Sequence, residues 1–524
     1  MYALNVLQQG GEAVGDRTRS VDTVAPVVAP ALGGGANAVP ILQTAAGAAG
    51  AAPSAAPSIA SLIKVDPTIA AARAAAAAAA AASAAPALGP DGRPKLRVLF
   101  CGTHPIGQSN GYSRVTYYIC RHLGLYDDIA LTLYGFQKYN QTDGSDARND
   151  IPPSVTLYDA LAGEEPKRHG FGEKEIAKYI REHPCDILII YNDPMVVTAL
   201  TQTLVAELTA DERRAFKLVS YADQVYPYQK PAYIKLLNDH FDAVIAFTPY
   251  WRDTIYELGY DRSKPCYVFP HGFDTKRYFP IPMKLARLYF NMPAPADSFV
   301  VLQLNRNTPR KRGDLMMMAW AEIVSRHLKL KSLRSAANPP KMIHLMIASQ
   351  MNGSYNLLEI YEHELKRFGI SLDVGRQYLL TVPRPQQMSD RDVGILYNAC
   401  NLGLNTCEAE GAGLNQIEHS AVGYPQVASD IGGFKEYLKD GATALLTKPT
   451  HRYYIDNSRD GIGGIAEVSE PLAFADAIWK YYTNPNLALK HGAAGRRHII
   501  QHYPWKEMIS LFRRVLLKIG ERAV

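Results

Sequence analysis

The sequence predicts an α/β protein that contains two Rossmann-like, doubly wound domains. From residue 95 onward, buried-strand patterns alternate with helical patterns, which is typical of a parallel sheet with helices on both faces. A proline-rich stretch interrupts this series at residues 273–298, and a fresh alternation of strands and helices follows it. The 524 residues have room for two or three domains that each bury a core.

The composition indicates a globular chain of modest charge. Hydrophobic residues make up 47% and charged residues 20%, and the formal net charge of +6 is not gathered in one basic run. We therefore expect no nucleic-acid partner, whereas an anionic ligand or an acidic membrane surface stays compatible. The six cysteines form no CxxC pair, so we expect reduced core residues, no metal site, and a cytoplasmic protein that is cytosolic or peripheral to a membrane.

Residues 1–93 are rich in Ala, Gly and Pro and are expected to be a disordered tail, with a frayed helix over the alanine tract. The alternative is a tether or a targeting arm. Alanine is too weakly hydrophobic for a membrane span, and Arg73 lies within the tract. No compact leucine-rich segment follows the N-terminus, which argues against a signal peptide.

Three further segments are predicted after the tail. Residues 94–285 form the first domain, residues 286–490 form the second domain, and residues 491–524 form a terminal helix that packs back toward the first domain. Residues 273–298 are expected to be the linker between the domains, and residues 451–467 an inserted loop near the cleft between them.

The first domain opens with a strand at residues 95–102, a glycine-containing loop and a helix. Gly107 and Gly111 would let the backbone approach a sugar or phosphate, and Ser113 and Arg114 would lie in the first helical turn. The alternative is a tight turn without a ligand. We also expect polar residues at later strand ends, namely Asn192, Asp193, Asp223, Gln224 and His271, either to line a site or to cap loops.

The second domain carries a basic turn and a glycine-rich loop. Arg306, Arg310, Lys311 and Arg312 follow its first strand, and they form either a diphosphate clamp or a solvated turn. Residues 407–438 contain two carboxylates, glycines and two expected helix starts, which suits a nucleotide diphosphate sugar. We expect Asn415 to cap the first of these helices, with Glu418 as the partner in a capping box.

The ordered motifs resemble the GT-B glycosyltransferases, in particular glycosyltransferase family 4, over most of residues 95–510. Four segments carry the resemblance: the Glu410-x7-Glu418 signature, PHGFDTKRYFP at residues 270–280, RNTPRKRG at residues 306–313, and residues 503–505. It implies two domains that face each other across a cleft. It also implies a metal-independent, cofactor-free enzyme that transfers a hexose, with retention, from a nucleotide diphosphate sugar to a glycan, lipid or small-molecule hydroxyl.

The resemblance also implies residue roles. Arg306 and Lys311 would hold the donor diphosphate, and Glu418 the ribose hydroxyls. The transferred sugar would contact the loop Glu410, Gly411, Ala412, Gly413 and Leu414.

The chain departs from the family pattern in three places. Ala222 stands where many relatives carry a histidine, so Asp223 is the nearest polar candidate and joins Glu410 as an expected catalytic residue. Asn415 replaces a common proline, and the usual GGxxR/H loop appears only as NGYSR. A nucleotide-sugar epimerase and a catalytically silent binding protein remain the alternatives. The base, the sugar, the acceptor and the oligomeric state stay open.

Overall fold

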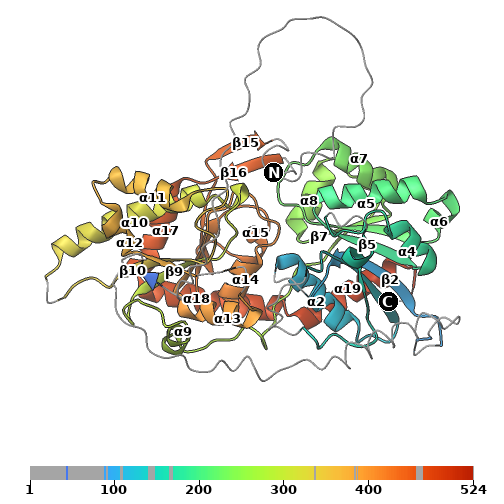
Figure 1. Cartoon of the computed structure of the whole chain (residues 1–524), viewed down its shortest axis with the longest axis horizontal. Coiled ribbons are helices and arrows are strands. Elements are labelled where there is room, and N and C mark those ends of the chain that lie inside the picture. The colour runs from blue at the N-terminus through green and yellow to red at the C-terminus, as the bar shows by residue number, and fades with distance from the viewer. Residues whose placement is uncertain are drawn as a thin grey trace, which may run out of the picture.

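The computed structural model describes residues 43–44, 88–89, 92–106, 110–139, 148–164, 169–335, 338–382, 385, 388–455 and 464–522. Within these ranges the chain forms two seven-stranded sheets, each flanked by helices, which lie side by side in Figure 1. The predicted fold class is confirmed. Nearly all of the predicted tail lies outside the described ranges.

The first sheet has the order β4-β3-β2-β5-β6-β7-β8, and all of its strand pairs are parallel. Its strands are β2 (Leu96–Thr103), β3 (Ile129–Phe136), β4 (Thr156–Asp159), β5 (Ile187–Asn192), β6 (Lys217–Ala222), β7 (Ala243–Ala246) and β8 (Cys266–Val268). Strand β4 was not predicted, because its four residues are only partly buried and show no apolar run. The other strands match the apolar runs that predict them.

The helices of this half connect successive strands. They are α2 (Gly111–Leu123), α3 (Ala160–Gly163), α4 (Ile176–Glu182), α5 (Pro194–Glu207), α6 (Ala210–Arg214), α7 (Pro231–His240) and α8 (Pro249–Glu257). The side chain of Asp193 accepts hydrogen bonds from the amides of Met195 and Val196 at the start of α5. Asp193 therefore caps a helix, which is one of the two roles we expected for it.

The second sheet has the order β1-β11-β10-β9-β12-β13-β14, with only β1 antiparallel to its neighbour among the described strands. Its strands are β1 (Gln43–Thr44), β9 (Phe299–Gln303), β10 (Ile343–Ile347), β11 (Leu379–Thr381), β12 (Leu402–Asn405), β13 (Gln426–Ser429) and β14 (Ala444–Thr447). The helices of this half are α10 (Gly313–Leu333), α11 (Leu357–Lys366), α12 (Leu372–Arg376), α13 (Asp390–Ala399), α14 (Leu414–Ala421), α15 (Phe434–Tyr437), α17 (Pro471–Thr483) and α18 (Pro485–His502). The central parallel strands are fully buried, as sheets covered on both faces require.

Two segments differ from their predicted form. The expected linker contains the helix α9 (Met283–Tyr289), whose Arg287 side chain donates hydrogen bonds to backbone carbonyls of Ala399 and Ser298. The prediction of a loop at residues 451–467 was wrong, because β15 (His451–Ile455) and β16 (Gly464–Val468) form an antiparallel hairpin there. Turn-forming residues between the two strands obscured the strand pattern.

The last helix, α19 (Trp505–Ile519), packs against α2 of the first half. The Arg513 guanidinium pairs with the Asp128 carboxylate, and the Arg522 side chain donates to backbone carbonyls of Pro94 and Lys95. Helix α18 packs instead against α14 of the second half, so the predicted boundary at residue 490 falls within it. The domain boundaries themselves stay a prediction. No helix in the described part of the chain has the length and apolar content needed to cross a bilayer.

Candidate functional site

The loop after β12 brings the chain to a sharp turn at Gly413. Its φ is +80°, in the left-handed region that side chains rarely adopt, and it caps the start of α14. A Cβ at this position would collide with the ring of Phe434. Glycine is therefore required here both by the backbone conformation and by the available space.

The predicted cap at Asn415 was wrong. Helix α14 begins at Leu414, so Asn415 lies inside its first turn, and its side-chain amide donates to the backbone carbonyl of Leu304. Glu418 is one turn further along and takes no part in a capping box. Asparagine is a preferred N-cap residue, so the sequence favoured Asn415. Gly413 caps the helix through its backbone conformation and has no side chain that would indicate this role.

Glu410 is buried beside two cations of the basic turn. The Lys311 ammonium pairs with its Oε2, and the Arg310 guanidinium lies 3.5 Å from its Oε1. Burial alone would raise the pKa of Glu410, but Lys311 and Arg310 outweigh burial and hold that pKa below its ordinary value. Glu410 is therefore a carboxylate at neutral pH, and one of its two cationic partners, Lys311, is itself a predicted donor residue.

Asp223 follows β6 and receives a hydrogen bond from the hydroxyl of Tyr112. Burial raises the pKa of Asp223 to about 6, with further upward contributions from Asp193 and Glu410, while Tyr112 and Arg310 act in the opposite direction. A carboxyl group that titrates near neutral pH can exchange a proton with a substrate hydroxyl.

The two loops meet at the junction of the two halves. A Cβ at Gly411 would lie 2.6 Å from Asp223 Oδ1, and a Cβ at Gly111 would lie 3.5 Å from the Leu414 side chain. The indole of Trp251 in α8 donates a 2.7 Å hydrogen bond to the carbonyl of Gly411. Helices α2 and α14 thus both start at this junction, where their N-terminal amides favour an anionic or hydroxyl-rich group.

Glu418 is held by Arg114, which belongs to the other half of the molecule. Arg114 Nη1 lies 2.6 Å from Oε1 and 2.5 Å from Oε2, and the Tyr397 hydroxyl donates to Oε2 at 2.8 Å. Burial raises the pKa of Glu418, and Arg114 and Tyr397 offset only part of that rise. Arg114, predicted for an acceptor or phosphate loop, is therefore an interdomain ion-pair partner here.

Asp390, at the start of α13, extends this charged network. Its carboxylate accepts from Arg277 at 2.6 Å and from Arg148 at 3.1 Å, and Arg114 Nε lies 3.6 Å away. Burial acts to raise the pKa of Asp390, but the three guanidinium groups outweigh burial and lower it.

Tyr112, Arg148, Asp390 and Tyr397 belong to this arrangement and were not assigned roles from the sequence. Tyr112 had a local signal, since it adjoins Gly111. The other three gave none, because their partners are distant in sequence. Arg310 was expected in the basic turn, as part of either a diphosphate clamp or a solvated turn.

The remaining predicted residues take different positions. Ser113 lies in the first turn of α2, as expected, and its hydroxyl accepts from Arg148 at 3.1 Å. Ala412 is buried within the glycine loop, whereas Arg306 is exposed at the rim of the basic turn. Gly107 lies outside the described residues.

The histidine of the PHG motif is buried among aromatic rings. The His271 ring centroid lies 4.4 Å from that of Phe247, and burial lowers the pKa of His271 to about 3. This imidazole is therefore neutral. Phe247 lies against Gly411, since a Cβ there would approach its ring to 3.1 Å, so His271 sits one residue layer away from the loop.

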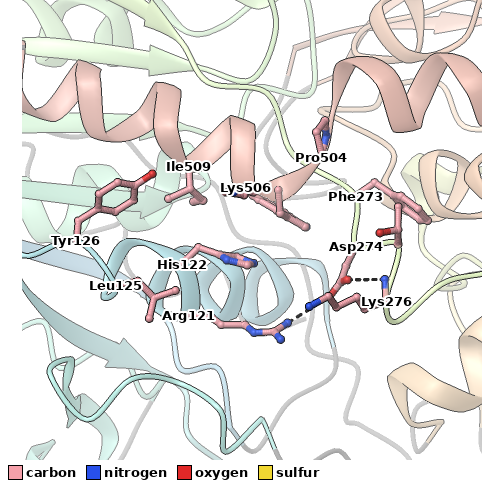
Figure 2. A pocket seen from close by; sticks show the side chains of 12 residues that line it. Arg121, His122, Leu125, Tyr126, Phe273, Asp274, Lys276, Pro504, Lys506 and Ile509 are labelled. Atoms are coloured by element: carbon pink, nitrogen blue, oxygen red, sulfur yellow. Dashed lines mark hydrogen bonds and ion pairs between the residues drawn. The ribbon is translucent and has the colours of Figure 1, made fainter.

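A cavity of about 440 Å³ lies elsewhere, between α2, α19 and residues 273–276, as Figure 2 shows. Arg121, Lys276 and Lys506 line it together with apolar side chains such as Leu125 and Ile509. None of the predicted site residues that the structure describes is part of this lining. Within the same described ranges, no group of three or more His, Cys, Asp or Glu side chains is arranged to hold a metal ion.

Comparison with known proteins adds family information. The sequence model of the family described as Glycosyl transferases group 1 matches residues 381–460, which include Glu410 and Glu418. A D-inositol 3-phosphate glycosyltransferase of Nocardia farcinica is 28% identical over 208 residues, covering 40% of this chain and 42% of the relative. A GDP-mannose-dependent alpha-(1-6)-phosphatidylinositol monomannoside mannosyltransferase of Mycolicibacterium smegmatis is 24% identical over 281 residues, covering 53% and 63%. The chain thus spans less than two thirds of the length of each relative.

Solved structures are similar over a longer stretch. Anabaena HepE in complex with UDP and glucose has a TM-score of 0.57 at 16% identity, covering 81% of this chain and 100% of that chain. A sucrose-phosphate synthase of Thermosynechococcus elongatus has a TM-score of 0.59 at 15% identity, covering 82% and 100%. At these identities, the likeness establishes the fold.

Proposed function

We propose that the chain, which shares its fold with the solved structures above, is a GT-B glycosyltransferase of the glycosyl transferases group 1 family. It transfers a hexose from a nucleotide diphosphate sugar to an acceptor hydroxyl, with retention of configuration. The second half of the molecule holds the donor, and the first half selects the acceptor. The site between the halves is where the two substrates meet.

One observation carries the proposal: the loop of Glu410 and Gly411 lies against Asp223 of the opposite half. Lys311 and Arg310 bring positive charge to this loop, and the N-termini of α2 and α14 add their dipoles. A leaving nucleoside diphosphate gains negative charge as the bond to the sugar breaks. Fixed cations beside it stabilise that charge in the transition state more than in the ground state.

The donor residues have distinct tasks in this proposal. Lys311 and the exposed Arg306 bind the diphosphate, since ammonium and guanidinium groups both pair with phosphate oxygens. Glu418 accepts hydrogen bonds from the ribose hydroxyls while it keeps its contact with Arg114. Glu410 and the backbone of residues 411–414 hold the transferred hexose, where an ionised carboxylate accepts from sugar hydroxyls.

Asp223 faces the acceptor side. Its pKa of about 6 leaves it mostly ionised at pH 7, so it can accept the hydrogen bond of the attacking hydroxyl. Tyr112, whose hydroxyl donates to Asp223, fixes the orientation of the carboxylate. Ala222 adds no polar side chain at the end of β6, which leaves this task to Asp223.

The relatives suggest substrate classes for this chain. The names of the curated relatives include an inositol phosphate acceptor, a phosphatidylinositol mannoside acceptor and a GDP-mannose donor, and HepE was solved with UDP and glucose. UDP- and GDP-hexoses are therefore the first donors to test, and polyols or glycans, free or lipid-linked, the first acceptors. The basic net charge is compatible with acceptors at a membrane surface.

The test is the release of nucleoside diphosphate from UDP-, GDP- and ADP-hexoses. We expect release from at least one donor by the wild type, and a loss of about 10²-fold in Lys311→Ala. Lys329→Ala, which removes an exposed lysine on α10, is the matched control and should retain full activity. Conversion of the donor sugar without nucleoside diphosphate release would instead identify an epimerase, and binding without turnover of any donor would identify a silent binding protein.

A further inference from the structure

The hairpin of β15 and β16 stands at the junction of the two halves. The strands pair antiparallel from His451 with Val468 to Ile455 with Gly464. Figure 1 shows the hairpin between the two sheets, at the top of the view. The residues that join its strands lie outside the described part of the chain.

The hairpin contacts the first half through the segment that follows Asp223. A Cβ at Gly464 would lie 2.6 Å from Tyr226 Cβ, so β16 packs directly on this segment. Its buried residues form a small apolar cluster of Val225, Tyr226, Ala409, Ile455 and Ala466. The cluster joins three segments that are distant in sequence, two from the second half and one from the first.

The hairpin is also anchored to Glu408, in the segment that leads to the proposed donor-binding loop of residues 410–414. The Tyr453 hydroxyl donates to Glu408 Oε2 at 2.6 Å, and the backbone amide of Glu467 donates to the carbonyl of Glu408 at 3.0 Å. Glu408 lies two residues before Glu410. The hairpin therefore extends the wall of the candidate site from the glycine loop to the segment after Asp223.

Two tyrosines remain on the surface of this wall. Tyr454 of β15 is 59% exposed, and its ring lies 6.0 Å from that of the half-buried Tyr228, at an angle of 68°. Tyr228 comes from the first half and Tyr454 from the second. An aromatic ring exposed to this degree contributes little to the core, so its position next to a site points to a contact with a partner molecule.

We propose that Tyr228 and Tyr454 bind a saccharide unit of the acceptor, an inference that rests on the proposed function and specifies its acceptor. A pyranose ring presents an apolar face of C–H groups, which packs on an aromatic ring, and a rim of hydroxyls. Two rings at a steep angle offer a floor and a side wall to such a unit. Tyrosine adds a hydroxyl for hydrogen bonding at low conformational cost.

The neighbouring charges favour a saccharide over a lipid surface. His451 and Arg452 are exposed on the same strand, and Arg452 pairs with Glu467 of β16 at 2.6 Å. The tyrosine pair thus has polar groups beside it, whereas insertion into a membrane would require a continuous apolar face. A carboxylate and a guanidinium group at its rim supply acceptors and donors for sugar hydroxyls.

The full chain, fluorescently labelled, is tested on a glycan array together with Tyr454→Ala and Tyr454→Phe. We expect the wild type to bind a subset of the glycans and Tyr454→Ala to lose about fivefold or more in affinity for that subset. Tyr454→Phe keeps the ring and should remain close to the wild type. Tyr289→Ala, which removes a tyrosine that is 54% exposed on α9, is the matched control.

Absence of glycan binding by the wild type, or equal binding by wild type and Tyr454→Ala, would overturn the proposal. Tyr228→Leu in the first half provides a second variant, and it should lose affinity for the same glycans. Release of nucleoside diphosphate by the wild type is measured in parallel. No release from any donor contradicts the proposed function, whereas release together with Tyr454-independent glycan binding contradicts the saccharide surface alone.

Discussion

Asp223 is the side chain whose chemistry most depends on its surroundings. Its position after a strand predicts either a site residue or a loop cap, and its catalytic role was expected only because Ala222 is not a histidine. Burial and the nearby carboxylates raise its pKa to about 6. The sequence could not predict this shift, because Tyr112, Glu410 and Arg310 come from three other segments.

The pKa of Asp223 predicts a pH dependence of transfer. Because the carboxylate must be ionised to accept a hydrogen bond, activity should rise with pH through a midpoint near 6 and then level off. Asp223→Asn should lower the rate by about 10²-fold and remove this acidic limb. Initial rates from about pH 5 to 8 measure both effects. An unchanged acidic limb in Asp223→Asn would assign the titration to another group.

The buried ion pair of Arg114 and Glu418 joins the two halves, so we expect its loss to lower the free energy of unfolding. Both side chains are buried, so Arg114→Met leaves an unpaired carboxylate and should cost about 3–5 kcal/mol. The double variant Arg114→Met with Glu418→Gln should recover part of that loss. Urea denaturation followed by tryptophan fluorescence measures the coupling between the two changes.

An exposed ion pair serves as the control for this experiment. Lys235 and Asp239 lie one helical turn apart in α7, with side chains 73% and 43% exposed. Lys235→Met should change stability by about 0–1 kcal/mol. A loss in Arg114→Met as small as in this control, with no coupling to Glu418, would show that the buried pair does not hold the halves together.

At the level of elements, the alternation of apolar runs was sufficient to predict most strands of both sheets. This alternation failed to predict elements that are only half-buried or that pack on residues from distant parts of the chain. Strand β4 is short and half-buried, and β15 and β16 form a hairpin that packs on residues 225–228 rather than on its own sheet. The start of α14 was misplaced because Gly413 caps it through its backbone conformation.

Substitution of Gly413 tests the turn in the loop of residues 410–414, which we propose to hold the sugar of the donor. Gly413→Ala should destabilise the protein and weaken nucleotide binding, because the methyl group would collide with Phe434 in addition to the cost of a left-handed alanine. Gly441→Ala is the matched control, since its φ is +69° and nothing lies within 4 Å of the added Cβ. The difference between the two variants in thermal denaturation should be about 1–3 kcal/mol. Equal losses of stability in the two variants would show that a collision with Phe434 does not contribute.

At the scale of the whole molecule, the two halves are joined by a buried charge network and by α19. The sequence predicted two α/β units, but it gave no sign that Asp390 of the second half would meet Arg148 of the first. Such pairs arise only after both sheets have formed and packed together. Local sequence patterns therefore predict the interface between the two halves less well than the rest of the fold.

Asp390 predicts how this interface responds to acid. Its folded-state pKa is lowered, so its contribution to stability is fully present above the ordinary value of 3.8 and is lost as the pH falls below it. Asp390→Asn should cost about 3–5 kcal/mol at pH 7, because three guanidinium groups lose their buried partner. It should also flatten the acid dependence of the thermal midpoint, measured from about pH 7 to 3. An acid profile identical to that of the wild type would contradict the role of Asp390.

In the proposed function, a sugar leaves a nucleotide diphosphate at the junction of the two halves with its configuration retained. The most direct measurement follows the hydrolysis of an α-linked nucleotide hexose by ¹H NMR in the absence of acceptor, with the first anomer of the released hexose as the readout. We expect the α-anomer to appear first, together with free nucleoside diphosphate, and we expect Lys311→Ala to reduce both signals by about 10²-fold. Initial release of the β-anomer, or an isomerised sugar still attached to its nucleotide, would contradict it.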